Sequence, residues 1–98
     1  MNRKALLIGI DKYARNPLFC CINDVKELKK SLDFNEDGHR NFDIVEMFDE
    51  QCTRANLRKS IKGLFSGEGE VALLYFSGHG IDDKDDGYIV TYDYEKDD

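Results

Sequence analysis

The sequence Leu73-Leu74-Tyr75-Phe76-Ser77-Gly78-His79-Gly80 decides the fold, because an apolar run ends there at a histidine between two glycines. A short continuous apolar run is typical of a parallel strand that is covered on both faces, and the glycines let the backbone turn sharply after it. Open α/β sheets bind ligands beyond the carboxyl ends of their strands. His79 is therefore a candidate acid or base, with a histidine that only hydrogen-bonds its own loop as the alternative.

Strand and helix patterns alternate through the rest of the chain. An apolar run closed by Asp11 predicts a first strand, and apolar residues at helical spacing from Ile22 to Leu32 predict a helix that Asp24 and Glu27 begin as a capping box. Thr53 is the predicted cap of a second helix. The predicted strands are 5–10, 42–48 and 71–76, followed by an acidic loop at 81–86 and a short extended piece at 88–92.

This order of elements predicts an α/β fold, a three-layer sandwich with a mostly parallel sheet between helices. Short connections and right-handed crossovers favour a parallel sheet, and no repeat or linker divides the chain. In a sheet that begins in the middle, the first and third strands are neighbours and their carboxyl ends define the binding crevice. Asp11, the segment Cys20–Asp24 and His79 are then expected at one edge of the sheet.

The composition fits one globular domain with a single core. The chain has 98 residues, of which 41% are hydrophobic. No run approaches the ~20 apolar residues of a membrane span, and Arg3-Lys4 leads directly into a strand where a secretory signal needs an apolar stretch. The three cysteines include an adjacent pair, Cys20-Cys21, which disfavours a disulfide framework. We therefore expect a cytoplasmic protein without a membrane partner.

Negative charge is concentrated at one end of the sequence. The segment 82–98 has eight carboxylates and two lysines, which accounts for the whole net charge of −6. A neutral body with an acidic end argues against nucleic acid as a partner, because phosphate neutralisation needs a basic surface.

Four segments together resemble the caspase-like cysteine peptidases, closest to the metacaspase branch. The resemblance covers nearly the whole chain, in order, and implies a caspase-like fold. The segments that carry it are Ala5-Leu6-Leu7-Ile8-Gly9-Ile10-Asp11-Lys12-Tyr13, Cys20-Cys21-Ile22-Asn23-Asp24-Val25, Tyr75-Phe76-Ser77-Gly78-His79-Gly80 and Gly87-Tyr88-Ile89-Val90-Thr91-Tyr92-Asp93.

The resemblance implies roles for particular residues. The histidine that matches His79 assists a cysteine at the end of the next core strand, and the backbone amide that follows, here of Gly80, helps to bind the oxyanion. The nucleophile is expected beyond Asp98, so that residues 1–98 are the amino-terminal part of one catalytic domain, whose remainder is a partner. Alone, this part is expected to be inactive.

The resemblance also bears on substrate preference. The aspartate that matches Asp24 lies near the pocket for a basic side chain before the cut bond, which favours polypeptide cleavage after Arg or Lys. A helix cap is the simpler role for Asp24. Arg15 keeps open the alternative of cleavage after Asp.

The cysteines that are present have simpler explanations than catalysis. Cys20 and Cys21 precede a helix and are expected to pack beneath its start, although a helix N-terminus can lower a thiol pKa and an auxiliary role stays open. Cys52, at the end of the second strand, is expected to be structural.

The acidic stretch at 82–86 raises the question of calcium, on which many metacaspases depend. Hard cations take several oxygen ligands, but the spacing is not that of a helix-loop-helix calcium site. A solvated acidic loop is favoured and no metal ligand is assigned. His39, in a polar turn, points to no function.

Three functions are compatible with these patterns. The first is a cysteine endopeptidase that uses a Cys-His dyad, and the second is a non-catalytic caspase-like domain that binds or regulates. The third is a phospho-receiver module, which needs an aspartate where this chain has Ser77-Gly78-His79.

Overall fold

The computed structural model describes residues 3–33, 42–66, 71–83 and 86–94. None of the helices in these ranges is long and apolar enough to cross a membrane. In chain order the elements are β1 (Arg3–Gly9), α1 (Cys21–Asp33), β2 (Asp43–Phe48), the short 3-10 helix η1 (Asp49–Gln51), α2 (Arg54–Phe65), β3 (Val71–Ser77), β4 (Gly80–Asp83) and β5 (Asp86–Ile89).

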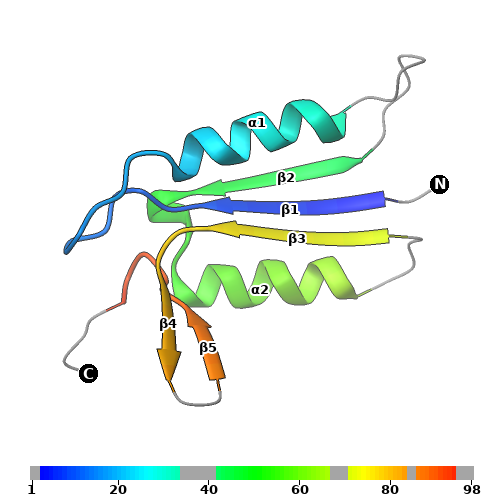
Figure 1. Ribbon diagram of the computed structural model, residues 1–98. Helices are drawn as coiled ribbons and strands as arrows, with labels where there is room; N and C mark the ends of the chain where they lie inside the picture. Colours follow the sequence, from blue (N-terminus) through cyan, green and yellow to red (C-terminus); the bar gives the residue numbers. More distant parts are fainter. Residues whose placement is uncertain (1–2, 34–41, 67–70, 84–85, 95–98) are drawn as a thin grey trace.

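A parallel three-stranded sheet forms the centre of the molecule, with the order β2-β1-β3 (Figure 1). The register pairs Gly9 of β1 with Phe48 on one side and with Ser77 on the other. The predicted neighbourhood of the first and third strands is therefore confirmed. Because all three strands run the same way, their carboxyl ends meet at one edge of the sheet.

The two helices cover opposite faces of this sheet (Figure 1). On the α1 face, Val25 packs with Ala5 and Leu7 of β1. On the α2 face, Leu57 belongs to the same buried cluster as Ile8. Alternate side chains of β1 thus enter different cores, as the two-residue period of a strand requires. The predicted three-layer sandwich is confirmed.

The acidic stretch 81–86 was predicted as a loop, and this prediction is wrong. β4 and β5 pair as an antiparallel hairpin, in which Ile81 lies opposite Tyr88. Ile81 also packs against the buried cluster on the α2 face of the sheet. The acidic composition concealed this apolar anchor, which holds the hairpin against the body of the protein.

The predicted start was correct for α2 and wrong for α1. Thr53 is the N-cap of α2 and accepts a hydrogen bond from the Asn56 amide at 3.3 Å, as predicted. The capping box at Asp24 is wrong, because α1 begins at Cys21 and Asp24 lies within its first turn. Glu27 instead contacts Lys30 on the exposed surface.

Candidate functional site

Three segments distant in sequence meet at the carboxyl edge of the sheet. The Asp11 carboxylate accepts hydrogen bonds from the amides of Cys21 at 2.8 Å and Ile22 at 3.2 Å, so it caps α1 from the end of β1. Ser77 Oγ lies 3.4 Å from Asp24 Oδ2, which brings the end of β3 to the first turn of α1. His79 follows two residues later. The predicted meeting of these segments at one edge is confirmed.

A buried carboxylate from the neighbouring strand holds the loop after β1. Asp49 is 6% exposed and directly follows β2, with a positive φ of 45°. Its Oδ1 atom accepts hydrogen bonds from the amides of Asp11 at 2.9 Å and Lys12 at 3.0 Å. Asp49 thereby fixes the backbone that carries the Asp11 cap. No local sequence pattern indicated this role of Asp49.

The Tyr13 hydroxyl connects the histidine turn to the segment after β5. It accepts a hydrogen bond from the His79 amide at 3.0 Å and donates one to the Val90 carbonyl at 2.8 Å. The Tyr13 and His79 rings also contact each other, with centroids 4.5 Å apart. A Cβ atom on Gly78 would lie only 2.5 Å from this hydroxyl, so the close approach requires glycine there.

The His79 side chain is oriented by a backbone carbonyl. His79 Nε2 lies 2.6 Å from the Asn16 carbonyl oxygen. Since a carbonyl only accepts, Nε2 must carry the hydrogen, and in the neutral ring Nδ1 then has the lone pair. Asn16 has a positive φ of 54°, a conformation that asparagine tolerates better than most residues. His79 therefore presents Nδ1 as its proton acceptor, and no described residue occupies that nitrogen.

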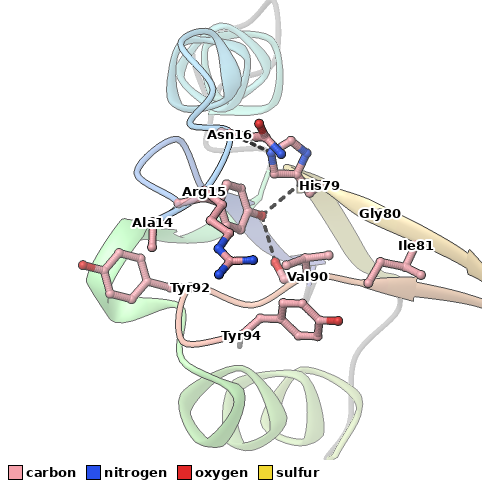
Figure 2. A pocket seen from close by; sticks show the side chains of 10 residues that line it. Ala14, Arg15, Asn16, His79, Gly80, Ile81, Val90, Tyr92 and Tyr94 are labelled. Carbon is pink, nitrogen blue, oxygen red and sulfur yellow. Dashed lines mark hydrogen bonds between the residues drawn. The ribbon is translucent and has the colours of Figure 1, made fainter. Parts of the chain in front are cut away.

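An open cavity of about 570 Å³ lies beside His79 (Figure 2). This volume is within the usual range of ligand sites. Gly80, at the start of β4, is exposed there. An imidazole at its edge can exchange protons with a bound molecule. The residues that line the cavity are Tyr13, Ala14, Arg15, Asn16, His79, Gly80, Ile81, Val90, Tyr92 and Tyr94.

The three cysteines lie outside this cavity. Cys21 is buried as predicted, and burial raises the pKa of its thiol. The N-terminus of α1 therefore does not activate Cys21. Cys20 was also predicted to pack beneath the helix start, but it is exposed, because it lies before α1 begins at Cys21. Cys52 is completely buried in the cluster on the α2 face, where burial and then the Asp49 carboxylate raise the pKa of its thiol to about 12. Its surroundings fit a packing role.

Asp24 is exposed in the first turn of α1 and does not line the cavity. Its role in substrate binding stays a prediction. Within the described ranges, no cluster of three or more histidine, cysteine or carboxylate side chains could hold a metal ion. Lys84, Asp85 and His39 lie outside those ranges.

The fold and the site define an α/β protein in which a histidine lines an open cavity at the carboxyl edge of a parallel sheet. Residues 2–97 match the caspase domain, and the chain therefore belongs to this family of cysteine peptidases. The phospho-receiver interpretation is set aside.

Fungal metacaspases are similar to nearly the whole chain. It is 34% identical over 113 residues to metacaspase-1 of Mycosarcoma maydis, covering 97% of this chain and 28% of that protein. It is 36% identical over 93 residues to metacaspase-1 of Eremothecium gossypii, covering 86% of this chain and 20% of the relative. For metacaspase-1 of Yarrowia lipolytica the identity is 35% over 113 residues, with 97% and 24% covered. The chain thus spans about a quarter of the length of these relatives.

Proposed function

We propose that the full-length protein is an endopeptidase in which His79 transfers protons and a cysteine outside residues 1–98 attacks the peptide bond. The observation that carries this proposal is the bond between His79 Nε2 and the Asn16 carbonyl, because it leaves Nδ1 available beside an open cavity. Membership of the caspase-domain family supplies the reaction class.

The chemistry follows from these positions. The imidazole accepts the proton of the attacking thiol and later donates it to the leaving amine, so that a covalent acyl-enzyme forms and is then hydrolysed by water. The Gly80 amide, at the cavity wall, is proposed to donate a hydrogen bond to the carbonyl oxygen as negative charge develops on it.

None of the three cysteines in the chain fits the role of nucleophile. Cys21 and Cys52 are buried and their pKa values are raised, which disfavours the reactive thiolate. Cys20 is exposed but is not part of the cavity that His79 lines. Residues 1–98 alone are therefore proposed to be inactive towards peptides.

Asp24 is proposed to select a basic substrate residue before the cut bond. Its carboxylate is exposed beside Ser77, two residues before His79 in the chain. An exposed carboxylate at this edge attracts Arg or Lys and repels Asp. A polypeptide with Arg or Lys at that position is the proposed substrate. The protein itself is proposed to act in the cytoplasm.

The proposal is tested with the full-length protein and fluorogenic peptides that differ only in the residue before the bond, Arg, Lys or Asp. His79→Ala should lower kcat by about 10²–10⁴-fold. His39→Ala, the other histidine, is the matched control and should leave kcat unchanged. Asp24→Asn should reduce the preference for Arg and Lys over an uncharged residue.

Two outcomes would contradict parts of the proposal. Amidase activity of residues 1–98 that His79→Ala abolishes would make one of the present cysteines the nucleophile. The non-catalytic alternative predicts no turnover and no covalent labelling of the full-length protein by a peptidyl acyloxymethyl ketone.

Assays with calcium and with a chelator decide whether the acidic stretch 82–86 has a role in activity.

A further inference from the structure

Arg15 is the only formally charged side chain among the described residues that line the cavity beside His79. In Figure 2 its guanidinium points into the cavity, toward Val90 and Tyr94. The chain as a whole has a net charge of −6, so an arginine in this place is opposite to the overall charge. A cation that faces a substrate cavity favours an anionic group there.

No described residue supplies a carboxylate to this guanidinium. Asp93 is close in sequence to Tyr92 and Tyr94, but its Oδ1 atom accepts hydrogen bonds from Thr91 Oγ1 at 2.8 Å and the Arg54 amide at 3.0 Å. Within the described ranges Arg15 thus has its hydrogen-bond donors available. An incoming carboxylate could accept two parallel bonds from them.

The walls around Arg15 strengthen such a contact. Ile81, Val90 and three tyrosines contribute apolar surface, and Val90 is 7% exposed. Apolar walls lower the local dielectric constant and therefore increase the attraction between opposite charges. The cavity of about 570 Å³ accommodates an acidic side chain together with part of its backbone.

Arg15 and Asp24 differ in their relation to the cavity beside His79, because Arg15 lines it and Asp24 does not. Asp24 lies in the first turn of α1, whereas the Arg15 guanidinium extends away from that helix (Figure 2). A peptide that passes His79 can therefore meet a negative charge on one side and a positive charge on the other. We propose that Arg15 binds the carboxylate of an acidic substrate residue that follows the cut bond, opposite the basic residue that Asp24 receives. This inference rests on the proposed function.

The test compares peptides that share Arg before the cut bond and differ after it, with Asp, Asn or Lys. For the full-length protein, kcat/KM should decrease in that order, and Arg15→Gln should reduce the preference for Asp over Asn by about threefold to fivefold, as for a solvent-accessible ion pair. Arg15→Lys should retain part of the preference, whereas Arg15→Glu should reverse the order of Asp and Lys. Salt should weaken the preference.

Arg58→Gln is the matched control, since it removes one exposed arginine of α2 outside the cavity. It should leave the order of the three peptides unchanged. A preference for Asp that Arg15→Gln does not alter would overturn the inference while the endopeptidase proposal stands. Arg15-dependent cleavage after Asp, rather than before it, would overturn the assigned position.

A binding measurement separates failure of this inference from failure of the proposed function. The Nε–Hε signal of Arg15 is followed by NMR in the 98-residue chain while the Arg-Asp or the Arg-Asn peptide is added. A shift caused by the Arg-Asp peptide alone supports the subsite even if no peptide is hydrolysed. Equal behaviour of both peptides, together with an unchanged signal, would overturn it.

Discussion

β1 and β3 lie side by side in one sheet (Figure 1), yet their side chains are buried to very different extents. Residues 5–9 of β1 are all buried, whereas Val71 and Leu74 of β3 are 43% and 39% exposed. Among the described strands β1 has two neighbours and β3 has one. The strand that supports the fold is therefore distinct from the strand that leads to His79, and substitutions should affect stability and the site separately.

The largest expected effect tests this contrast directly. Ile8 is completely buried, so Ile8→Ala should lower the free energy of unfolding by about 2–5 kcal/mol through lost burial and a cavity. Leu74→Ala on β3 should cost about 1 kcal/mol, because its side chain is already partly in water. Urea titrations followed by circular dichroism measure both values. If Ile8→Ala does not fold, Ile8→Val should still cost about 1 kcal/mol. Equal costs for Ile8→Ala and Leu74→Ala would remove the contrast.

The next effect is a loss of stability at alkaline pH that comes from the buried core. The pKa of Cys52 rises from 9.0 to about 12 on folding, so its thiol stays protonated in the native state when the unfolded chain already ionises. Its contribution is complete below pH 9 and is lost as the pH rises toward 12. Relative to Cys52→Ala, the native chain should lose roughly 2–3 kcal/mol between pH 8 and pH 11.

Urea titrations at several pH values measure this difference, with Cys20→Ala as the control because Cys20 is exposed. The chain with Cys20→Ala should keep the pH dependence of the unchanged chain. Parallel pH curves for the native chain and Cys52→Ala would contradict the assignment.

A smaller loss of stability is expected from a change at Tyr13, which follows β1 and whose hydroxyl contacts the histidine turn after β3. Tyr13→Phe keeps the ring beside His79 but leaves the His79 amide and the Val90 carbonyl without their partner. The expected loss is about 1–3 kcal/mol of unfolding free energy, with faster hydrogen exchange at the His79 amide. Tyr92→Phe is the matched control, because no described residue hydrogen-bonds the Tyr92 hydroxyl. Unchanged exchange in Tyr13→Phe would show that the hydroxyl does not hold the histidine turn.

The architecture was predictable because its determinants are local. Apolar runs located all three strands of the sheet, and helical spacing located both helices. The two wrong predictions of secondary structure, the start of α1 and the acidic loop, concern features that depend on contacts between distant parts of the chain. The start of α1 is set by Asp11, ten residues before Cys21, and the β4–β5 hairpin depends on Ile81 reaching a distant core cluster.

The site was predictable only in part for the same reason. His79 was identified from its own neighbours, since a histidine between glycines after an apolar run is a local pattern. Tyr13 and Asn16 bond residues 66 and 63 positions away, and Asp49 bonds one that is 38 positions away. The only available hints were the place of Tyr13 after the first strand and an asparagine before a proline. Neither identifies a partner.

The smallest expected effect compares the Ser77 hydroxyl, at the end of β3, with the Thr53 hydroxyl, at the N-cap of α2. Ser77 Oγ lies 3.4 Å from Asp24, longer than the 2.7–2.8 Å typical of a strong O–H···O bond, so Ser77→Ala should change the unfolding free energy by less than about 0.5 kcal/mol. Thr53→Ala should cost about 1 kcal/mol, because it removes the cap of α2. If Asp24 binds the basic residue as proposed, Ser77→Ala should raise KM only slightly for peptides with Arg before the cut bond in the full-length protein, since the donor that Asp24 loses is weak. A larger loss of stability for Ser77→Ala than for Thr53→Ala would mean that the end of β3 also contributes to the stability of the fold.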